Sequence, residues 1–371
     1  MLEMADLHAL VPNVLASLSR FTQETRLLRL TTPLGSDLLA ECVRAEEGIS
    51  QGYTLQVDAL STDAAIELKT LLGQPALLQL LTATSVDDLR PFHGHITKVA
   101  MNGSNGGFAR YTLTIEPWTA FLAHGSDSRI FQDMTVFAIV EAVFDAWQGQ
   151  GTLAPAWRLD IADESVYPRR SFTTQYHESG FACVERLLHE ECQFYFFEHT
   201  GDAAGATLGS HTMVIADHNG AFVPNTQASV NFTQPGAVMK VDSIDRWRSE
   251  TRWSTNAIEL RSWDYRAVND RPVSALDAGD APTLTSRDTP GAYAYSSREQ
   301  VQCIAERQVE ALAAARQLNV AADTVRTLSP GTTFTLYGQA QLDAAPNDDS
   351  RTFGIVRTVH LMRNNPSADL S

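Results

Sequence analysis

At 371 residues, 44% of them hydrophobic, the chain is long enough for two or more domains and has the composition of a folded protein. Lys and Arg number 28 against 44 Asp and Glu, so the formal net charge is 28 − 44 = −16. Such an acidic chain repels a phosphate backbone, which argues against a nucleic-acid partner. No uninterrupted apolar run reaches the length of a membrane span, and the first residues, M-L-E-M-A-D, are acidic where a signal peptide would be basic. We therefore expect synthesis and folding in the cytosol.

Residues 1–20 are interpreted as an N-terminal extension. Apolar residues recur there at helical spacing, but Pro12 limits the segment to a short docking helix or a frayed leader. Residues 21–122 then carry short alternating segments, such as Y-T-L-Q-V-D-A-L and Y-T-L-T-I-E-P-W. About six short strands with Gly-rich turns predict a first small antiparallel barrel or sandwich. The run N-G-S-N-G-G lies between two of these strands, so it indicates a hairpin turn and not a phosphate-binding loop.

An outer mixed α/β segment is expected over residues 123–235. The part that follows Asp133 predicts an amphipathic helix, because apolar residues recur at helical spacing with Glu141 and Asp145 on the opposite face. A second helix is predicted after Ser179, whose hydroxyl can cap the first turn. An aromatic strand, F-Y-F-F-E-H, follows that helix directly. The buried stripes of the two helices comprise Val136, Ile139, Val140, Val143, Phe144 and Trp147 in the first, and Phe181, Val184, Leu187 and Leu188 in the second.

A second barrel is predicted to form from two separated segments, residues 236–267 and 325–362. Alternating residues return in both segments, yet neither holds enough strands for an independent core. Between them, residues 268–324 are expected to form a helical insertion, with an exposed connection over 268–297. Ser296 with Glu299, or Ser297 with Gln300, can open its helix, which is expected to end near Asn319. The predicted fold class is α+β, mainly antiparallel β, with two small barrels and peripheral helical or mixed insertions.

Candidate catalytic and metal-binding residues carry weak signals. His93 and His95 lie on one face of a strand, as a metal pair does, but no third ligand is placed by the sequence. Glu178 is next to His177, and Asp217 is next to His218, at spacings that are not diagnostic of acid-base chemistry. Motifs of hydrolases, zinc proteases and nucleotide-binding proteins are missing from the sequence. We therefore predict no enzyme, no catalytic, cofactor-binding or metal-binding residues, and no cofactor.

The cysteines and tryptophans are also assigned structural roles. The cysteines are widely spaced, without a C-x-x-C pattern, and predict buried free thiols instead of a disulfide framework or a zinc site. The tryptophans and the aromatic strand favour core or subunit packing over carbohydrate binding, because most lie on alternating or helical stripes. These residues are Cys42, Cys183, Cys192 and Cys303, and Trp118, Trp147, Trp247, Trp253 and Trp263.

Motifs along the whole chain resemble the VgrG family, the spike and hub proteins of type VI secretion systems, which are related to contractile phage tail hubs. They occur in the same order as in that family, from about residue 20 to His360. Two positions depart from the family pattern: Gly180 stands where an acidic residue is usual, and Cys192 where glycine is usual. A non-glycine residue at a left-handed helix end costs about 1 kcal/mol, so we expect this helix to end differently or to carry strain. The matching residues are Glu47, Ser50, L-L-G at 71–73, Phe92, Gly94, Tyr111, E-P-W at 116–118, S-R-I-F-Q at 128–132, Tyr167, Arg169, Q-Y at 175–176, E-S at 178–179, Phe181, R-L-L at 186–188, F-Y-F-F-E-H at 194–199 and T-M-V-I-A-D-H-N-G-A-F at 212–222.

The resemblance implies a structural hub that forms a homotrimer. Three copies with two similar barrels each would present six quasi-equivalent units and could match a six-fold tube. The implied partners are an Hcp-like hexameric tube, baseplate components, effector or adaptor proteins and a C-terminal spike module, and the assembly would be secreted through the injection apparatus. Contact residues for the trimer and the tube are not assigned, because outward-facing strand positions look alike whether they meet water or a neighbour.

Three alternatives stay open on the sequence. An OB-fold and a needle would be expected after His360 in this family, so the chain is either the hub part of a longer protein or a short hub whose spike is another chain. It could belong to a secretion system or to a phage-like particle. The alternative function is a hydrolytic or metal-dependent enzyme on a β scaffold, with its site in residues 268–297 or near His177 and Asp217.

Overall fold

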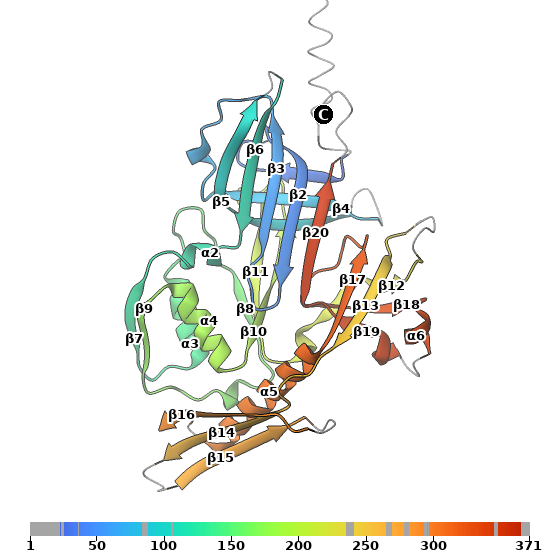
Figure 1. Cartoon of the computed structure of the whole chain (residues 1–371). Coiled ribbons are helices and arrows are strands. Elements are labelled where there is room, and N and C mark those ends of the chain that lie inside the picture. Colours follow the sequence, from blue (N-terminus) through green and yellow to red (C-terminus); the bar gives the residue numbers. More distant parts are fainter. Residues whose placement is uncertain are drawn as a thin grey trace, which may run out of the picture.

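A computed structural model describes residues 23, 26–35, 37–83, 88–104, 107–234, 241–264, 269–277, 282–292, 295, 297–344 and 348–364. Strands dominate these residues and most strand pairs are antiparallel, so the fold is α+β and mainly antiparallel β, as the sequence predicts. A curled sheet stands above a mixed layer that holds the helices α3 and α4, and further strands extend to one side and below (Figure 1). No helix in the described part of the chain combines the length and the apolar character needed to cross a bilayer.

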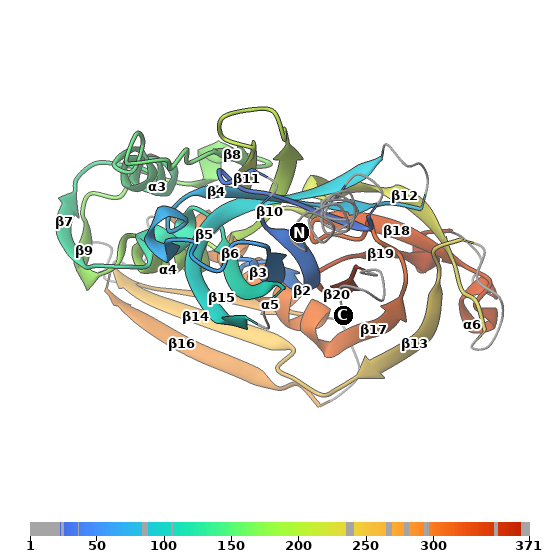
Figure 2. The same cartoon turned by 90° about the horizontal axis from the view of Figure 1, so that it is seen from above.

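The curled sheet has seven strands in the order β1-β4-β5-β6-β3-β2-β20, and Figure 2 looks down onto its curl. Its inward faces supply nearly half of the largest core cluster, including Leu55, Val57, Leu113 and Ile115. The polar residues between them point outward, which is the alternation expected of half-buried strands. Its strands are β1 (Leu28–Thr31), β2 (Leu39–Gly48), β3 (Thr54–Ser61), β4 (Pro75–Leu81), β5 (Leu89–Ser104), β6 (Ala109–Glu116) and β20 (Arg357–Arg363).

The last strand of the chain completes this sheet, which corrects the prediction that residues 325–362 belong together in a second barrel. β20 pairs antiparallel with β2, with Cys42 opposite Arg363 and Gly48 opposite Arg357. At the end of β20 the buried Asn364 side chain accepts from the Leu28 amide (2.7 Å) and donates to the carbonyls of Leu28 (3.0 Å) and Ala40 (2.7 Å). One asparagine thus joins β1 to β2 and draws the two ends of the curl together.

The mixed layer contains the two helices that the sequence predicts, each with a side-chain cap. Thr135 accepts from the Ala138 amide at the start of α3, and Ser179 accepts from the Ala182 amide at the start of α4. The predicted stripes of both helices are buried in the largest core cluster, except that Trp147 and Phe181 are half-buried. The elements are α2 (Thr119–Leu122), β7 (Asp127–Phe131), α3 (Val136–Asp145), β8 (Trp157–Asp160), β9 (Thr173–Glu178), α4 (Gly180–Glu190), β10 (Phe194–Gly201) and β11 (Gly209–Ala216).

The turn after α4 shows the strain expected at Cys192. This residue has a φ of +56°, in the left-handed region that favours glycine, and its amide donates to the His189 carbonyl (3.1 Å). Its thiol lies 3.9 Å from the Ile304 carbonyl and packs against the cluster under helix α5 (Arg298–Arg316). Helix α4 therefore ends in the left-handed conformation that glycine usually adopts, but with a cysteine at that position.

A further group of strands shares a third core. β12 pairs with β18 in parallel, β18 pairs with β19, and β13 pairs with β17. Ile244 of β13 and Phe334 and Leu336 of β18 lie in one cluster, so residues from the two predicted parts of the second barrel do meet. The elements are β12 (Val223–Asn231), β13 (Ile244–Thr251), β17 (Gln317–Asp323), β18 (Thr332–Tyr337), the short helix α6 (Ala340–Asp343) and β19 (Thr352–Gly354).

The described residues of 268–324 differ from the prediction of a helical insertion with an exposed connection over 268–297. β14 (Ala257–Asp264) pairs with β15 (Asn269–Leu276) and β16 (Thr285–Ala292), and α5 packs on this sheet. Ser297 caps α5 by accepting from the Gln300 amide (3.1 Å), one of the two predicted alternatives. The helix ends at Arg316, not near Asn319, and the chain continues directly as β17. The Pro- and Asp-rich sequence of β15 and β16 lacks the alternation typical of strands. These residues form strands because their backbones pair with β14.

Candidate functional site: a buried histidine joint

The joint is the place where β5 of the curled sheet meets β10 and β11 of the mixed layer. His93 and His95, which the sequence places on one face of a strand, both lie on the buried face of β5 with 3% and 2% of their surface exposed. Gly94 between them has no room for a side chain, because an added Cβ would lie 2.7 Å from Ile115 and 2.9 Å from the Glu116 carbonyl. The strand therefore presses closely on β6 and holds both rings toward β11.

His93 and His211 form a direct ring-to-ring contact across the joint. Their Nδ1 atoms are 2.8 Å apart. The Nε2 of His93 lies 2.7 Å from the Thr207 carbonyl, and the Nε2 of His211 lies 2.8 Å from the Trp118 amide nitrogen. All four ring nitrogens of the pair thus have a partner.

His95 and His199 flank this pair. The Nε2 of His95 lies 3.4 Å from the Thr152 carbonyl, and its buried Nδ1 has no hydrogen-bond partner among the described residues. The Nδ1 of His199 accepts from the His93 amide (3.2 Å), and its Nε2 lies 3.2 Å from the Glu47 carboxylate. Four histidines from three strands therefore share one buried region.

An ion pair adjoins the histidines on the β2 side. Arg90 donates to Glu47 at 2.6 Å, and their side chains are only 10% and 5% exposed. Arg90 also donates to the Arg326 carbonyl (3.0 Å) and to the Nε2 of His360 (2.8 Å). Since Arg326 precedes β18 and His360 lies on β20, this pair links the curled sheet to the later strands.

Burial shapes the ionisation of the joint. It lowers the pKa of His93 to about 4, and together with the neighbouring rings it lowers the pKa of His211 well below its ordinary value. Burial and the Arg90 charge bring the pKa of His360 to about 4. Burial alone raises the pKa of Glu47, but Arg90 and His199 outweigh it and lower the value to about 2. At neutral pH the joint therefore holds one ion pair and uncharged His93, His211 and His360.

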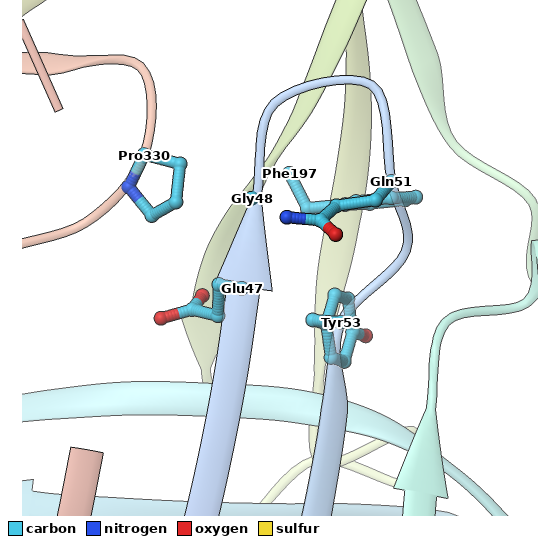
Figure 3. A pocket seen from close by; sticks show the side chains of 6 residues that line it. All are labelled: Glu47, Gly48, Gln51, Tyr53, Phe197 and Pro330. Atoms are coloured by element: carbon cyan, nitrogen blue, oxygen red, sulfur yellow. The ribbon is translucent and has the colours of Figure 1, made fainter. Parts of the chain in front are cut away.

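The hollow beside the joint is too small to be a ligand site. Its lining atoms leave no space for a water molecule. Figure 3 shows Glu47 near the end of β2 and Gln51 and Tyr53 in the turn that leads to β3, with Phe197 behind them and Pro330 on the opposite loop. Within the described residues, no group of three or more His, Cys, Asp and Glu side chains could hold a metal ion.

Asp217 and His218, the first acid-base candidate, have separate structural partners. The Asp217 carboxylate is fully buried and accepts from the Ala162 amide (2.9 Å), the Tyr167 hydroxyl (2.7 Å) and Arg307 of α5 (2.8 Å). His218 instead lies 3.2 Å from Asp160. Asp217 therefore ties α5 to the mixed layer.

Glu178 and His177 are likewise separated. Glu178 pairs with Arg186 of α4 (2.5 Å), and the exposed His177 stacks edge-on against Tyr176. Among the tryptophans, Trp118 is fully buried in the core, whereas Trp253 and Trp263 are 66% and 46% exposed. The predicted core packing therefore holds for Trp118 but not for Trp253 or Trp263.

Most of the joint is not predicted from the sequence. His211, His360 and Arg90 belong to no predicted site or matching motif, and Glu47 and His199 appear only within the matching motifs, without a role. A signal was present, because Tyr195, Phe197 and His199 alternate along β10 and place His199 on the buried side, and His211, Met213 and Ile215 do the same along β11. A histidine on a buried strand face needs buried partners, which only the fold identifies.

Comparison with known proteins gives one family and a consistent fold. The phage tail baseplate hub (GPD) family matches residues 46–366. The type VI secretion system spike protein VgrG1b of Pseudomonas aeruginosa is 28% identical over 334 residues, which cover 86% of this chain and 42% of that protein. The chain thus spans less than half the length of this curated relative.

Two solved structures share the fold. One is the E. coli c3393 protein, described as a type VI secretion component similar to the T4 tail proteins gp27 and gp5, with a TM-score of 0.61, 18% identity, and coverage of 92% of this chain and 74% of that one. The other is the 43 kDa tail protein of prophage MuSo2 from Shewanella oneidensis, with a TM-score of 0.60, 11% identity, and coverage of 92% and 95%. At these identities the likeness concerns the fold alone.

Proposed function

Because the chain belongs to the phage tail baseplate hub family, we propose that it is the structural hub of a contractile injection apparatus, as at the base of a type VI secretion spike. The observation that carries this proposal is the family match over residues 46–366, which spans the curled sheet, the mixed layer and the later strands together. The fold shared with tail proteins over nine-tenths of the chain supports it.

We further propose that three copies assemble into a ring with two barrel-like units per copy. The curled sheet closed by Asn364 is the first unit, and the strands around the third core are the second. In this proposal β20 belongs to the first unit and β12 to the second, and the other domain boundaries are those predicted from the sequence. Six such units around a three-fold axis would fit the end of a six-fold tube.

The proposed partners follow from this role. They are an Hcp-like hexameric tube, baseplate components, effector or adaptor proteins and a C-terminal spike module, in the same or another chain. The assembly would leave the producing cell through the apparatus. A hydrolytic activity is not favoured by any described side-chain group, since Asp217 and Glu178 are held in ion pairs with arginines.

The mass of the purified chain in solution tests the proposal. Light scattering is expected to give three times the chain mass, and negative-stain images are expected to show a ring. Mixing with purified Hcp-like hexamers should then produce a stable stacked complex. A monomer that neither forms rings nor binds the hexamer would contradict a hub role, and chelator treatment should change none of these results.

A further inference from the structure

The His93–His211 contact crosses the joint between two separate layers. His93 lies on β5 of the curled sheet and His211 on β11 of the mixed layer, and both side chains are at least 97% buried. The Nδ1–Nδ1 distance of 2.8 Å is that of a hydrogen bond. The two layers are therefore linked by a bond whose donor and acceptor are both titratable rings.

The partners of the outer ring nitrogens fix where the protons lie. The Thr207 carbonyl can only accept, so the Nε2 of His93 carries a hydrogen. The Trp118 amide can only donate, so the Nε2 of His211 carries none. A neutral ring has a single N–H, so His211 must donate from Nδ1 to the bare Nδ1 of His93. The bonds run in one direction, from Trp118 through His211 and His93 to Thr207.

This arrangement holds only while both rings are neutral. A proton added to Nδ1 of His93 would face the N–H of His211, and a proton added to Nε2 of His211 would face the N–H of Trp118. In each case two donors would lie about 2.8 Å apart in a buried site, which breaks a hydrogen bond across the joint. His199 differs, because its protonated Nδ1 could donate to the His93 carbonyl at 3.2 Å.

Among the described residues, no neighbouring group is free to stabilise a proton added to His93 or His211. The Glu47 carboxylate is already bound by Arg90 and His199, and His95 lies 5.9 Å from His93 and 5.6 Å from His211 between ring centres. The Tyr53 hydroxyl donates to the His93 carbonyl, and Glu116 binds Thr97 instead. The titratable groups of the described residues that face the pair are Tyr53 before β3, His95 on β5 and His199 on β10, and Glu47 on β2 and Arg90 on β5 lie behind His199.

We propose that the His93–His211 pair is a proton-sensitive latch: acidification opens the joint between β5 and the β10–β11 layer while the curled sheet stays folded. The lowered pKa values of both rings agree with opening at low pH. Protonation is easier in the open form, so the latch is fully closed above a pH of about 6.5 and weakens as the pH falls toward 4. A ring that titrates near 4 when closed and near 6.5 when open favours opening roughly thirty-fold at pH 5.

Hydrogen exchange of the full chain at pH 7.5 and 5.0, corrected for intrinsic amide rates, tests the latch. Protection of β10 and β11 is expected to fall about thirty-fold or more at pH 5, while β3 keeps its protection. The variant H93Q/H211Q retains an amide donor and acceptor at each position without a titrating ring, so its protection should fall much less between the two pH values, with the buried His95 left to respond. The exposed His189→Gln is the matched control and should respond as the natural protein does.

Each other outcome overturns the proposal. Equal protection of β10 and β11 at both pH values in the natural protein means that no latch exists, and loss of β3 protection in parallel means global acid unfolding. A pH response of undiminished size in H93Q/H211Q assigns the sensor to another group. If the double variant does not fold, H93Q and H211Q are measured singly, and each must reduce the response. Burial raises the pKa of Asp323 to about 6, so this residue stabilises the fold on acidification and cannot imitate the latch.

Discussion

Cys192 shows at the scale of one residue how a local rule is broken. Its φ of +56° costs a non-glycine residue about 1 kcal/mol. The thiol is half-buried against the α5 cluster, so replacing it also removes some packing. The chain therefore keeps a strained helix end together with a side chain that contacts α5.

We expect Cys192→Gly to be more stable than Cys192→Ala by about 1 kcal/mol. Both variants lose the thiol and its packing, but only glycine relieves the left-handed backbone. Urea unfolding of the two variants side by side measures the difference. Equal midpoints would show that the backbone at this turn relaxes at little cost.

At the scale of elements, the closing of the curled sheet depends on β20 and on the residue after it. Asn364 is 1% exposed and satisfies three backbone groups on β1 and β2. Without the side chain those groups would remain buried and unpaired, because β1 and β2 are not paired with each other as strands. The last described residue thus completes an element that begins at Leu28.

Asn364→Ala is expected to lower the free energy of unfolding by about 2 kcal/mol, because it leaves buried hydrogen-bond donors and acceptors without partners. Exchange of the Leu28 amide should quicken more than exchange in β3. Asn102→Ala is the matched control, since that exposed side chain donates to the Thr112 hydroxyl on the surface and its loss should cost little. A similar small cost for both variants would mean that β1 is held by packing alone.

At the scale of the whole molecule, buried ion pairs join layers that are distant in sequence. Glu47 and Arg90 tie the curled sheet to the loop before β18, and Asp217 and Arg307 tie the mixed layer to α5. Breaking such a pair leaves a buried charge without its partner, which costs far more than losing a surface pair. These residues therefore help to set how the layers sit together.

Asp217→Asn should destabilise the protein by about 3 kcal/mol and increase hydrogen exchange in α5 in particular, because Arg307 loses its carboxylate. Asp160→Asn is the control, since this carboxylate is one-third exposed and its pairs with Arg158 and His218 are screened by water. Chemical unfolding and exchange mapping check both variants. Unchanged exchange in α5 would show that the cluster of Val301, Ile304 and Val309 holds the helix without the ion pair.

The sequence by itself determined the local elements, because caps and apolar stripes act within a few residues. Thr135 and Ser179 cap the two helices of the mixed layer, and their stripes are buried as their spacing predicts. The family resemblance also supplied the fold class and the hub role. The left-handed turn at Cys192 could be expected because the family usually carries glycine at this position.

The tertiary structure alone decided which strands pair and which buried polar groups meet. Alternation in T-V-H-L-M predicts that Val359 and Leu361 are buried, but both are exposed and Met362 on the other face is buried, so tertiary packing and not the alternation placed β20 beside β2. The strands β15 and β16 form because β14 offers them backbone partners. The histidine joint combines residues more than a hundred positions apart, and the tautomers of His93 and His211 follow from backbone groups at Thr207 and Trp118 that no sequence pattern places there.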